Sequence, residues 1–331
     1  MKYFDIANPF STGPPSEWDI DRAIGMLKSA PEAKAAVATL VGYGRAAVAP
    51  LKQFLFQNHP SADGEPRCRA VEALGALHAK DVLIDYLKRK RNHVDPTIGA
   101  AEQEVENAAA RVLAAFRTAD VFEFLGELAL PQLRTGLVEA LGQFAAAEAI
   151  PFFIRALGEE TCCAQAGEAL RRLGPKTEAA LRCAALTPVP SAEAEWSSSL
   201  RRRIRALDLL LEINASKETW SLLRTLLMDS DQHVVTAASR LAARLGSRED
   251  RLTAVARLLK IPLRGDWFLQ GEIQNCLVGL HPDAKELVDE EIARRLGSPQ
   301  SQRGSDPLLR MLLRVRRQVE PGPVPVEDSR V

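Results

Sequence analysis

Aromatic residues are scarce in this chain of 331 residues, where Phe, Tyr and Trp together make up only 5%. Hydrophobic residues still account for 46%, so a core must be built mainly from Ala, Leu and Val. Such a composition favours closely packed helices over a β-sandwich. No segment alternates apolar and polar residues convincingly, as a strand would. The composition therefore predicts an all-α fold.

Net charge is also absent, because 43 basic residues balance 43 acidic ones. A dedicated nucleic-acid binder needs a basic excess to neutralise phosphates, so we expect no nucleic-acid partner. No uncharged run reaches a dozen residues, whereas a membrane helix needs about 20 apolar residues. The first residues lack the apolar segment of a secretory signal. These features predict a cytoplasmic protein that does not enter a membrane.

The five cysteines give an odd count, and none of their spacings forms a CxxC pair. Histidine is also scarce and lies apart from cysteine in the sequence, so we expect no metal site and reduced thiols. Neither an HExxH pair nor a GxSxG nucleophile elbow occurs. We therefore predict no catalytic residue, no cofactor and no enzymatic activity.

A short pattern recurs along the chain and consists of two small apolar residues, a polar residue and Ala-Leu, often followed by Gly. Its clearest copies are residues 70–75 and 137–142. Weaker copies end at Leu40, Leu113, Leu170, Leu210, Ala242 and Leu277, so that successive copies lie 28 to 40 residues apart. Because this interval accommodates a helix, a turn and a second helix, the pattern predicts about eight helix pairs.

Residues typical of helix ends flank these copies. Asp231 and Asp266 precede apolar segments and are expected to cap helix N-termini. Several glycines follow helical segments and are expected to adopt left-handed C-terminal caps. These are Gly75, Gly142, Gly174, Gly246 and Gly297.

The two longest intervals between copies indicate insertions, which we interpret as loops at residues 91–101 and 186–199. Loops on a rigid scaffold often carry function, so Trp196 in the second loop is a candidate partner-binding residue. The alternative is that both loops are plain connectors. At the ends of the chain, we interpret residues 1–18 as an N-terminal arm and the proline-rich residues 319–331 as a disordered tail.

The repeats resemble HEAT repeats, in particular the short Ala-rich bacterial kind named after phycobilisome lyases. The consensus of that family has Val-Arg, two spacers, Ala-Ala, a polar residue and Ala-Leu-Gly, and residues 67–75 and 133–142 match it best. Cys163, Val235 and Gln270 replace the consensus Arg in other copies. The resemblance implies a right-handed α-solenoid over residues 19–318.

Each repeat of a solenoid buries its face only against its neighbours, so the fold offers an extended concave surface and no deep catalytic pocket. We therefore expect a monomeric, non-enzymatic scaffold for a protein partner. The family name implies an alternative, a lyase-like or chaperone-like protein that acts on a cofactor-bearing partner. A HEAT-type nucleic-acid-binding protein is the third hypothesis, although its basic clusters, residues 88–91, 201–205 and 314–317, are interpreted as solvated surface.

The polar residue inside each copy provides the other candidate partner-binding positions. From the second copy onward it is Glu72, Arg111, Glu139, Glu168, Asp208, Arg240 and Asn275. In the HEAT family the second helix lines the concave face, so these positions are expected to form a ladder. We expect its four acids to repel one another and to meet a basic partner. Simple solubility is the alternative explanation. The candidate residues are Glu72, Arg111, Glu139, Glu168, Asp208 and Trp196.

Overall fold

The computed structural model describes residues 15–57, 63–89, 95–192, 195–263, 266–297 and 306–319. These residues form helices and turns, and their one extended pairing is an isolated bridge between Pro190 and Glu195. The predicted all-α fold is confirmed for this part of the chain. None of its helices combines the length and the apolar character that a membrane crossing demands.

The chain divides into two compact units, Met1–Phe152 and Phe153–Val331, which we call unit 1 and unit 2. The helices of unit 1 are α1 (Glu17–Met26), α2 (Ala33–Gly42), η1 (Gly44–Ala47), α3 (Val48–Phe56), α4 (Glu65–Ala76), α5 (Lys80–Lys88), α6 (Pro96–Ala114), α7 (Ala119–Ala129), α8 (Thr135–Gln143) and η2 (Ala147–Ala149). Helix α9 (Ile150–Ala156) crosses the division between the units.

Unit 2 continues with the same kind of short helices. They are α10 (Cys163–Leu173), η3 (Gly174–Thr177), α11 (Glu178–Leu186), α12 (Ser197–Glu212), α13 (Lys217–Leu223), η4 (Arg224–Met228), α14 (Gln232–Leu245), α15 (Arg248–Leu258), α16 (Trp267–Gly279), α17 (Lys285–Leu296) and α18 (Pro307–Val319).

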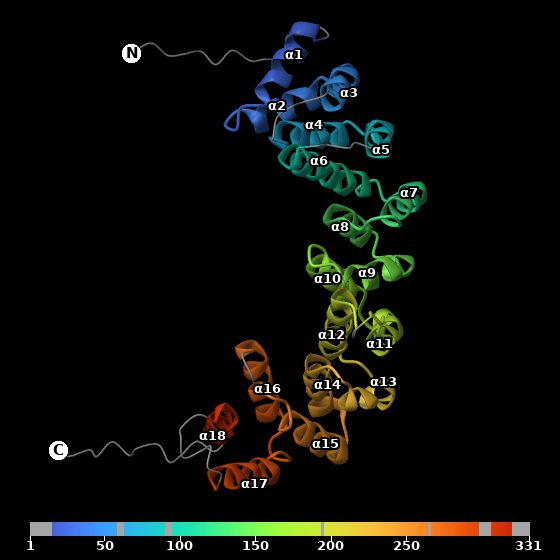
Figure 1. Cartoon of the computed structure of the whole chain (residues 1–331). Coiled ribbons are helices and arrows are strands. Elements are labelled where there is room, and N and C mark those ends of the chain that lie inside the picture. The colour runs from blue at the N-terminus through green and yellow to red at the C-terminus, as the bar shows by residue number, and fades with distance from the viewer. Residues whose placement is uncertain are drawn as a thin grey trace, which may run out of the picture. The chain divides into compact units, whose positions relative to one another are not determined.

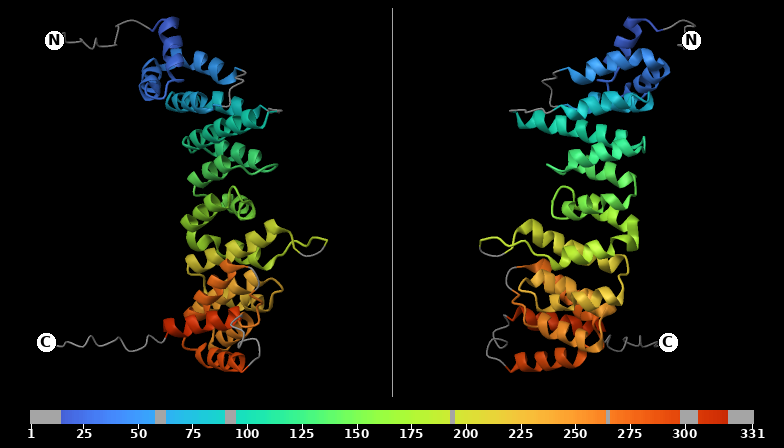
Figure 2. Two further views of the ribbon diagram at one scale, coloured as in Figure 1. Left: turned by 60° about the vertical axis from the view of Figure 1, so that its left-hand side comes forward. Right: turned by 90° about the vertical axis from the view of Figure 1, so that its right-hand side faces the viewer.

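Even-numbered helices form a continuous row within each unit, and odd-numbered helices pack beside that row (Figures 1 and 2). In unit 1, α4 packs between α2 and α6, and α6 packs in turn on α8. In unit 2, the helices α10, α12, α14, α16 and α18 contact one another in series. Each described helix of a row thus packs against the next even-numbered helix of the same row.

The repeated sequence pattern marks the even-numbered helices. The residues that end the copies are Leu40, Leu74, Leu113, Leu141, Leu170, Leu210, Ala242 and Leu277, and all are fully buried. They lie in α2, α4, α6, α8, α10, α12, α14 and α16, one in each helix. The small residues before them let neighbouring helices approach closely. At Gly136 of α8, an added Cβ would lie only 2.7 Å from the carbonyl oxygen of Asn107 in α6.

The predicted glycine caps are wrong at four of five positions. Only Gly174 has a positive φ, of 60°, whereas Gly75 and Gly142 lie inside helices and Gly246 and Gly297 have negative φ. The left-handed residue instead stands four positions after the buried Leu in six copies. These residues are Gly44, His78, Arg117, Ala145, Gly174 and Asn214. The chain takes this turn after the pattern helix in these six copies, and four of them adopt it without glycine.

The N-terminal caps are confirmed. The Asp231 carboxylate accepts hydrogen bonds from the backbone N–H groups of His233 and Val234 at 2.9 and 3.1 Å. The Asp266 carboxylate accepts one from the N–H of Leu269 at 2.9 Å. Both aspartates therefore satisfy amide groups that have no partner within the first helical turn.

The first predicted loop is wrong over part of its length. Residues 96–101 belong to α6, which begins at Pro96 after the N-cap Asp95, so a longer helix accounts for much of the interval. Residues 91–94 lie outside the described residues. Among the described residues of the second predicted loop, only those at its ends are helical, because α11 ends at Leu186 and α12 begins at Ser197.

The predicted chain ends are described only in part. Glu17 and Trp18 of the predicted arm already belong to α1, whose N-cap is Ser16, and residues 1–14 lie outside the described residues. In the predicted tail, Val319 is the last residue of α18, and residues 320–331 lie outside the described residues. The extent of the repeat array, residues 19–318, stays a prediction.

Candidate functional site

The candidate ladder residues lie on the even-numbered helices of each unit. In unit 1, Glu72 is on α4, Arg111 on α6 and Glu139 on α8. The Arg111 Nη1 atom lies 2.9 Å from Glu139 Oε2, so these two charges neutralise each other. Within the described residues Glu72 makes no ion pair, and its side chain is exposed. Among the described ladder positions of unit 1, Glu72 is therefore the carboxylate without an ion pair.

In unit 2 the corresponding carboxylates have arginine partners. Glu168 on α10 lies 2.5 Å from Arg171 Nη1, and Arg171 also pairs with Glu212. Asp208 on α12 lies 2.7 Å from Arg240 Nη2 on α14, and Arg240 reaches Glu272 at 3.5 Å. The expected repulsion among four acids is therefore wrong, because three of them are paired across or along the helices.

At Asp208, burial affects the pKa of the carboxyl group more strongly than the ion pair with Arg240 does. Loss of hydration raises the pKa of the Asp208 carboxyl above its usual value, although the Arg240 guanidinium acts in the opposite direction. Its side chain is only 21% exposed. A carboxylate held in this way is poorly placed to attract a second cation, since its nearest charge partner is already in contact.

An open hollow of about 640 Å³ lies between α4 and α6 beside Glu72, and we call it the α4–α6 hollow. Its wall combines small residues near the ends of both helices with larger apolar and polar side chains. The lining residues are Glu72, Gly75, Ala76, His78, Arg111, Val112, Ala115 and Phe116. The rings of His78 and Phe116 meet edge to face with centroids 6.0 Å apart. The hollow thus joins an apolar surface to an unpaired carboxylate and a paired guanidinium.

Trp196 is 59% exposed and immediately precedes α12. It borders a smaller cavity of about 140 Å³ whose other lining residues include Val189, Ser199 and Arg202. The Trp196 backbone N–H donates to the Val189 carbonyl at 3.1 Å. The structure therefore places Trp196 in unit 2, whereas Glu72 and Arg111 belong to unit 1.

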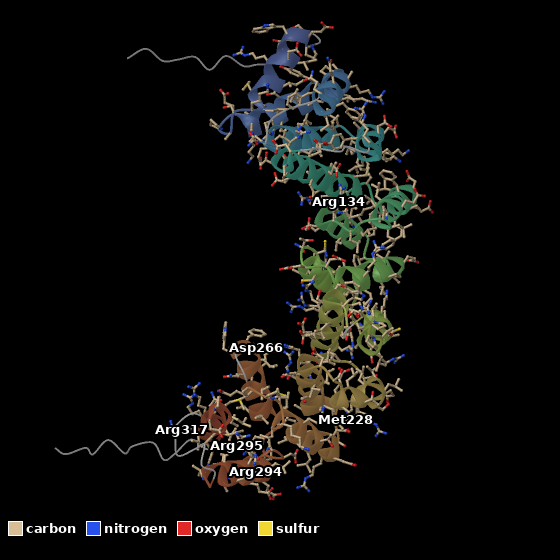
Figure 3. All side chains as sticks on the ribbon, viewed as in Figure 1. Arg134, Met228, Asp266, Arg294, Arg295 and Arg317 are labelled. Carbon is tan, nitrogen blue, oxygen red and sulfur yellow. The ribbon has the colours of Figure 1, made fainter. Side chains whose placement is uncertain are left out.

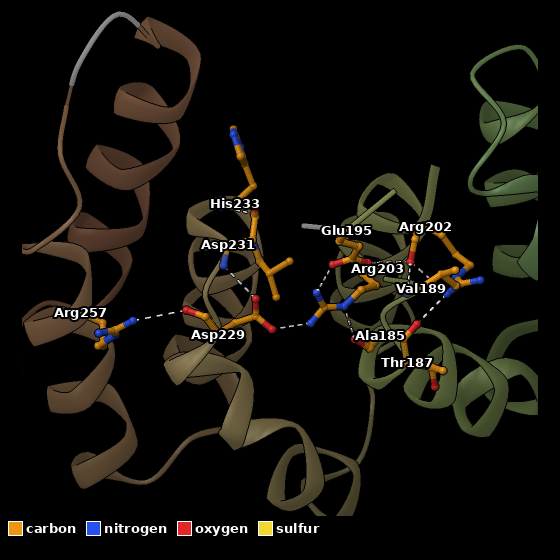
Figure 4. Close-up of polar contacts among 12 residues, drawn as sticks. Ala185, Thr187, Val189, Glu195, Arg202, Arg203, Asp229, Asp231, His233 and Arg257 are labelled. Carbon is orange, nitrogen blue, oxygen red and sulfur yellow. Dashed lines mark hydrogen bonds and ion pairs between the residues drawn. The ribbon is translucent and has the colours of Figure 1, made fainter. Parts of the chain in front are cut away.

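A buried arginine anchors the connector that contains Trp196 (Figure 4). Arg203 is 2% exposed, and its guanidinium contacts Glu195 at 2.7 Å and Asp229 at 2.5 Å. Its Nε atom also donates to the Ala185 carbonyl at 2.9 Å. One side chain therefore ties the end of α11, the connector before α12 and the turn before α14 together.

The interpretation of residues 201–205 as solvated surface is therefore wrong in part. Arg203 is buried, Arg201 donates to the Gly158 carbonyl at 2.6 Å, and Arg202 donates to the Thr187 carbonyl at 2.7 Å. These cations bind the protein's own oxygen atoms. The cluster consequently offers little of the phosphate-binding surface that a nucleic-acid interface needs.

Sequence reasoning missed the structural role of this arginine position. Arg67, Arg134 and Arg203 each stand seven residues before a buried Leu of the repeat pattern. Arg67 is buried and pairs with Glu102, which also accepts a 2.5 Å hydrogen bond from the Tyr86 hydroxyl. Arg134 pairs with Glu106 of α6. The sequence signal for this role is the common spacing of seven residues between the arginine and the buried Leu. In the structure, the arginines at this spacing form ion pairs within the protein.

The described residues show little chemistry beyond these charges. They contain no group of three His, Cys, Asp or Glu side chains placed to hold a metal ion. Burial raises the pKa of the Cys68 thiol to about 11 and that of the Cys276 thiol to about 12. Both thiols are therefore protonated near neutral pH and are poor nucleophiles. The prediction that the protein is not an enzyme stays a prediction.

Comparisons with known proteins identify no family for this chain. No family model matches it, and no curated protein is significantly similar to it. One similar solved structure is an engineered protein, with 18% identity, 93% of this chain and 96% of that chain covered, and a TM-score of 0.33. Another is the complex of CpcE and CpcF of phycocyanin lyase from Nostoc sp. PCC7120, with 17% identity, 96% and 100% covered, and a TM-score of 0.29. Because both scores are low, we draw no function from either likeness.

Proposed function

We propose that this protein is a HEAT-like α-solenoid that binds a protein partner along the row of even-numbered helices. Three features support the solenoid: the helices pack in series, the buried Leu recurs once per even-numbered helix, and the left-handed turn recurs at the same position. An array of this kind presents extended surface rather than an enclosed pocket. The proposal therefore assigns a scaffold function without catalysis.

The proposed contact site in unit 1 is the α4–α6 hollow. The observation that carries this assignment is the unpaired carboxylate of Glu72 at the edge of an apolar surface. Arg111, on the same surface, is already paired with Glu139. A partner segment that places an apolar side chain in the hollow and a Lys or Arg beside Glu72 would match both features.

The apolar contact is expected to supply most of the affinity. Burying a side chain the size of Leu contributes about 1.5–3 kcal/mol, whereas an exposed ion pair contributes about 0.2–1 kcal/mol. Glu72 would then select which apolar segments bind, by favouring those with a neighbouring cation. The row in unit 2 is less suited to this role because Glu168 and Asp208 already have arginine partners.

A random-peptide display library tests the site without knowledge of the natural partner. Selection on the purified protein should enrich peptides in which an apolar residue neighbours Lys or Arg. Ala115→Glu places a charge at an exposed position of the hollow and should weaken these peptides at least tenfold. Ala119→Glu adds the same charge at the exposed start of α7 and should leave binding unchanged. Peptides that bind Ala115→Glu as tightly as wild type would contradict the proposed site.

The two other functions suggested by the sequence gain no support from the described residues. The arginines at 201–203 bind oxygen atoms of the protein itself, which weakens the nucleic-acid hypothesis. The lyase-like or chaperone-like hypothesis depends on the sequence resemblance alone. A monomeric state and a cytoplasmic location likewise stay predictions.

A further inference from the structure

Two large aromatic side chains stand exposed at the start of α16 in unit 2. Trp267 is 81% exposed and Phe268 is 59% exposed. Their rings are nearly perpendicular, at 88°, with centroids 6.3 Å apart. Asp266, the residue immediately before Trp267, is labelled in Figure 3 and marks the N-terminal end of α16. We call Trp267 and Phe268 the aromatic pair.

The aromatic pair has the chemistry of a proline-binding surface. Exposed aromatic rings bind proline-rich segments in the polyproline II conformation, since that conformation loses little entropy on binding. Such a helix has three residues per turn, so two prolines separated by one residue project from two of its three faces. The two nearly perpendicular rings can contact prolines on two such faces.

The chain itself contains such a segment. Residues 320–331 lie outside the described residues, and their sequence has Pro321, Pro323 and Pro325 at every second position. Proline fixes φ near the polyproline II value. The segment follows directly on α18, which packs on α16 in the same unit. The chain thus carries a sequence of the kind that exposed aromatic rings bind.

The chain between Gln318 and the prolines is long enough to span the distance from Gln274 to Trp267. The Gln274 side chain of α16 donates to the Gln318 side chain of α18 at 3.3 Å, so the end of α18 lies against α16. Trp267 is seven residues before Gln274, or about 10 Å along the helix axis. Pro321 to Pro325 follow Gln318 by three to seven residues, which span about 9–22 Å in polyproline II. The prolines can therefore reach the aromatic pair without unfolding α18.

We propose that residues 321–325 of the same chain bind the aromatic pair and cover it. The high local concentration of a tethered segment makes this occupant favoured over a free peptide of similar sequence. The interaction is independent of the α4–α6 hollow, which lies in unit 1. It would also keep two exposed aromatic rings from contacts with other molecules.

Acrylamide quenching of Trp267 fluorescence in the full chain tests the proposal. Trp18→Phe and Trp196→Phe remove the other exposed tryptophans, and the remaining Trp220 is 4% exposed. Replacing Pro321, Pro323 and Pro325 by Ala should increase the quenching constant of Trp267 at least twofold. A synthetic peptide of residues 320–331, added to that variant, should restore the protection.

A matched reporter controls for indirect effects. A chain that keeps Trp18, which is 68% exposed in unit 1, and carries Trp196→Phe and Trp267→Phe should show no change on the same proline substitutions. Equal quenching of Trp267 with and without the prolines would overturn the proposal. Protection that disappears on dilution of the full chain would also overturn it, because a second copy would then be the occupant.

Discussion

Unit 1 and unit 2 share one repeat pattern but treat its charged positions differently. In unit 2, Glu168 and Asp208 each contact an arginine. In unit 1, Glu72 has no ion pair within the described residues and borders an open apolar hollow. The contrast teaches that residues at one repeat position are paired in some copies and, within the part of the chain that the structure describes, unpaired in another. The proposed contact site depends on an unpaired charge beside an apolar surface.

The largest expected effect is the loss of the buried arginine of unit 2. Arg203→Met should lower the free energy of unfolding by about 3–5 kcal/mol, because Glu195 and Asp229 would keep their charges in a mostly buried site without a cation. Urea unfolding followed by circular dichroism measures the change. Arg205→Met is the control, since Arg205 is 56% exposed and should cost less than about 0.5 kcal/mol. Equal losses would show that Arg203 does not anchor unit 2.

The apolar positions should behave alike in the two units, unlike the charged ones. Leu141→Ala in unit 1 and Leu210→Ala in unit 2 should each cost about 2–5 kcal/mol, because both side chains are fully buried. Glu139→Ala, two residues from Leu141, should cost less than about 0.5 kcal/mol. The same unfolding measurement serves for all three. If Glu139→Ala lowered the free energy of unfolding as much as Leu141→Ala, the assignment of residue 141 to the buried face of α8 and residue 139 to its outer face would be wrong.

The left-handed turn gives opposite effects at matching positions. Ala145→Gly in unit 1 should stabilise the protein by up to about 1 kcal/mol, because the φ of Ala145 is 51° and only glycine adopts that value without strain. Gly174→Ala in unit 2 should destabilise it by about 1–2 kcal/mol for the same reason. Thermal unfolding of both variants checks the signs. Stability changes of the same sign in both variants would show that Ala145 and Gly174 do not occupy equivalent left-handed turns.

The pH dependence of Asp208 is expected to be the smallest effect. Its pKa is raised in the folded protein, so the folded state holds the proton more tightly than the unfolded state. The stability that this group contributes is therefore present below its unfolded pKa and is lost as pH rises through its folded pKa. Asp208→Asn should gain stability relative to wild type over that interval, as measured by urea unfolding at a series of pH values. A constant difference would contradict the pKa direction.

The sequence predicted the even-numbered helices well because their small apolar residues recur with helical spacing. Leu74, Leu141 and Leu210 are buried as that pattern requires. The structure adds an ion pair between two of the polar pattern positions, Arg111 and Glu139, on neighbouring helices. The prediction succeeded where one helix and its immediate neighbour decide the outcome.

The remaining features depend on contacts that the spacing does not reveal. Arg203 binds Glu195, which precedes α12 in the sequence, and Asp229, which precedes α14. Its burial therefore depends on the path of the connector between α11 and α12. The α4–α6 hollow is lined partly by residues beyond the repeat pattern, such as Ala115 and Phe116, which the spacing of the copies does not bring together. Glycine is a poor marker of the left-handed turns, because their position follows the buried Leu of the pattern and four of the six lack glycine.

The affinity of one enriched peptide for two variants tests the central claim most directly. Fluorescence anisotropy would compare Glu72→Gln with the combined variant Glu168→Gln and Asp208→Asn in unit 2, which leaves the Arg111–Glu139 ion pair of the hollow intact. The account predicts that Glu72→Gln weakens binding about two- to fivefold and reduces its salt dependence, since it removes the unpaired carboxylate. The combined variant should retain the wild-type affinity. Retained affinity in Glu72→Gln, or an equal loss in the combined variant, would contradict the claim.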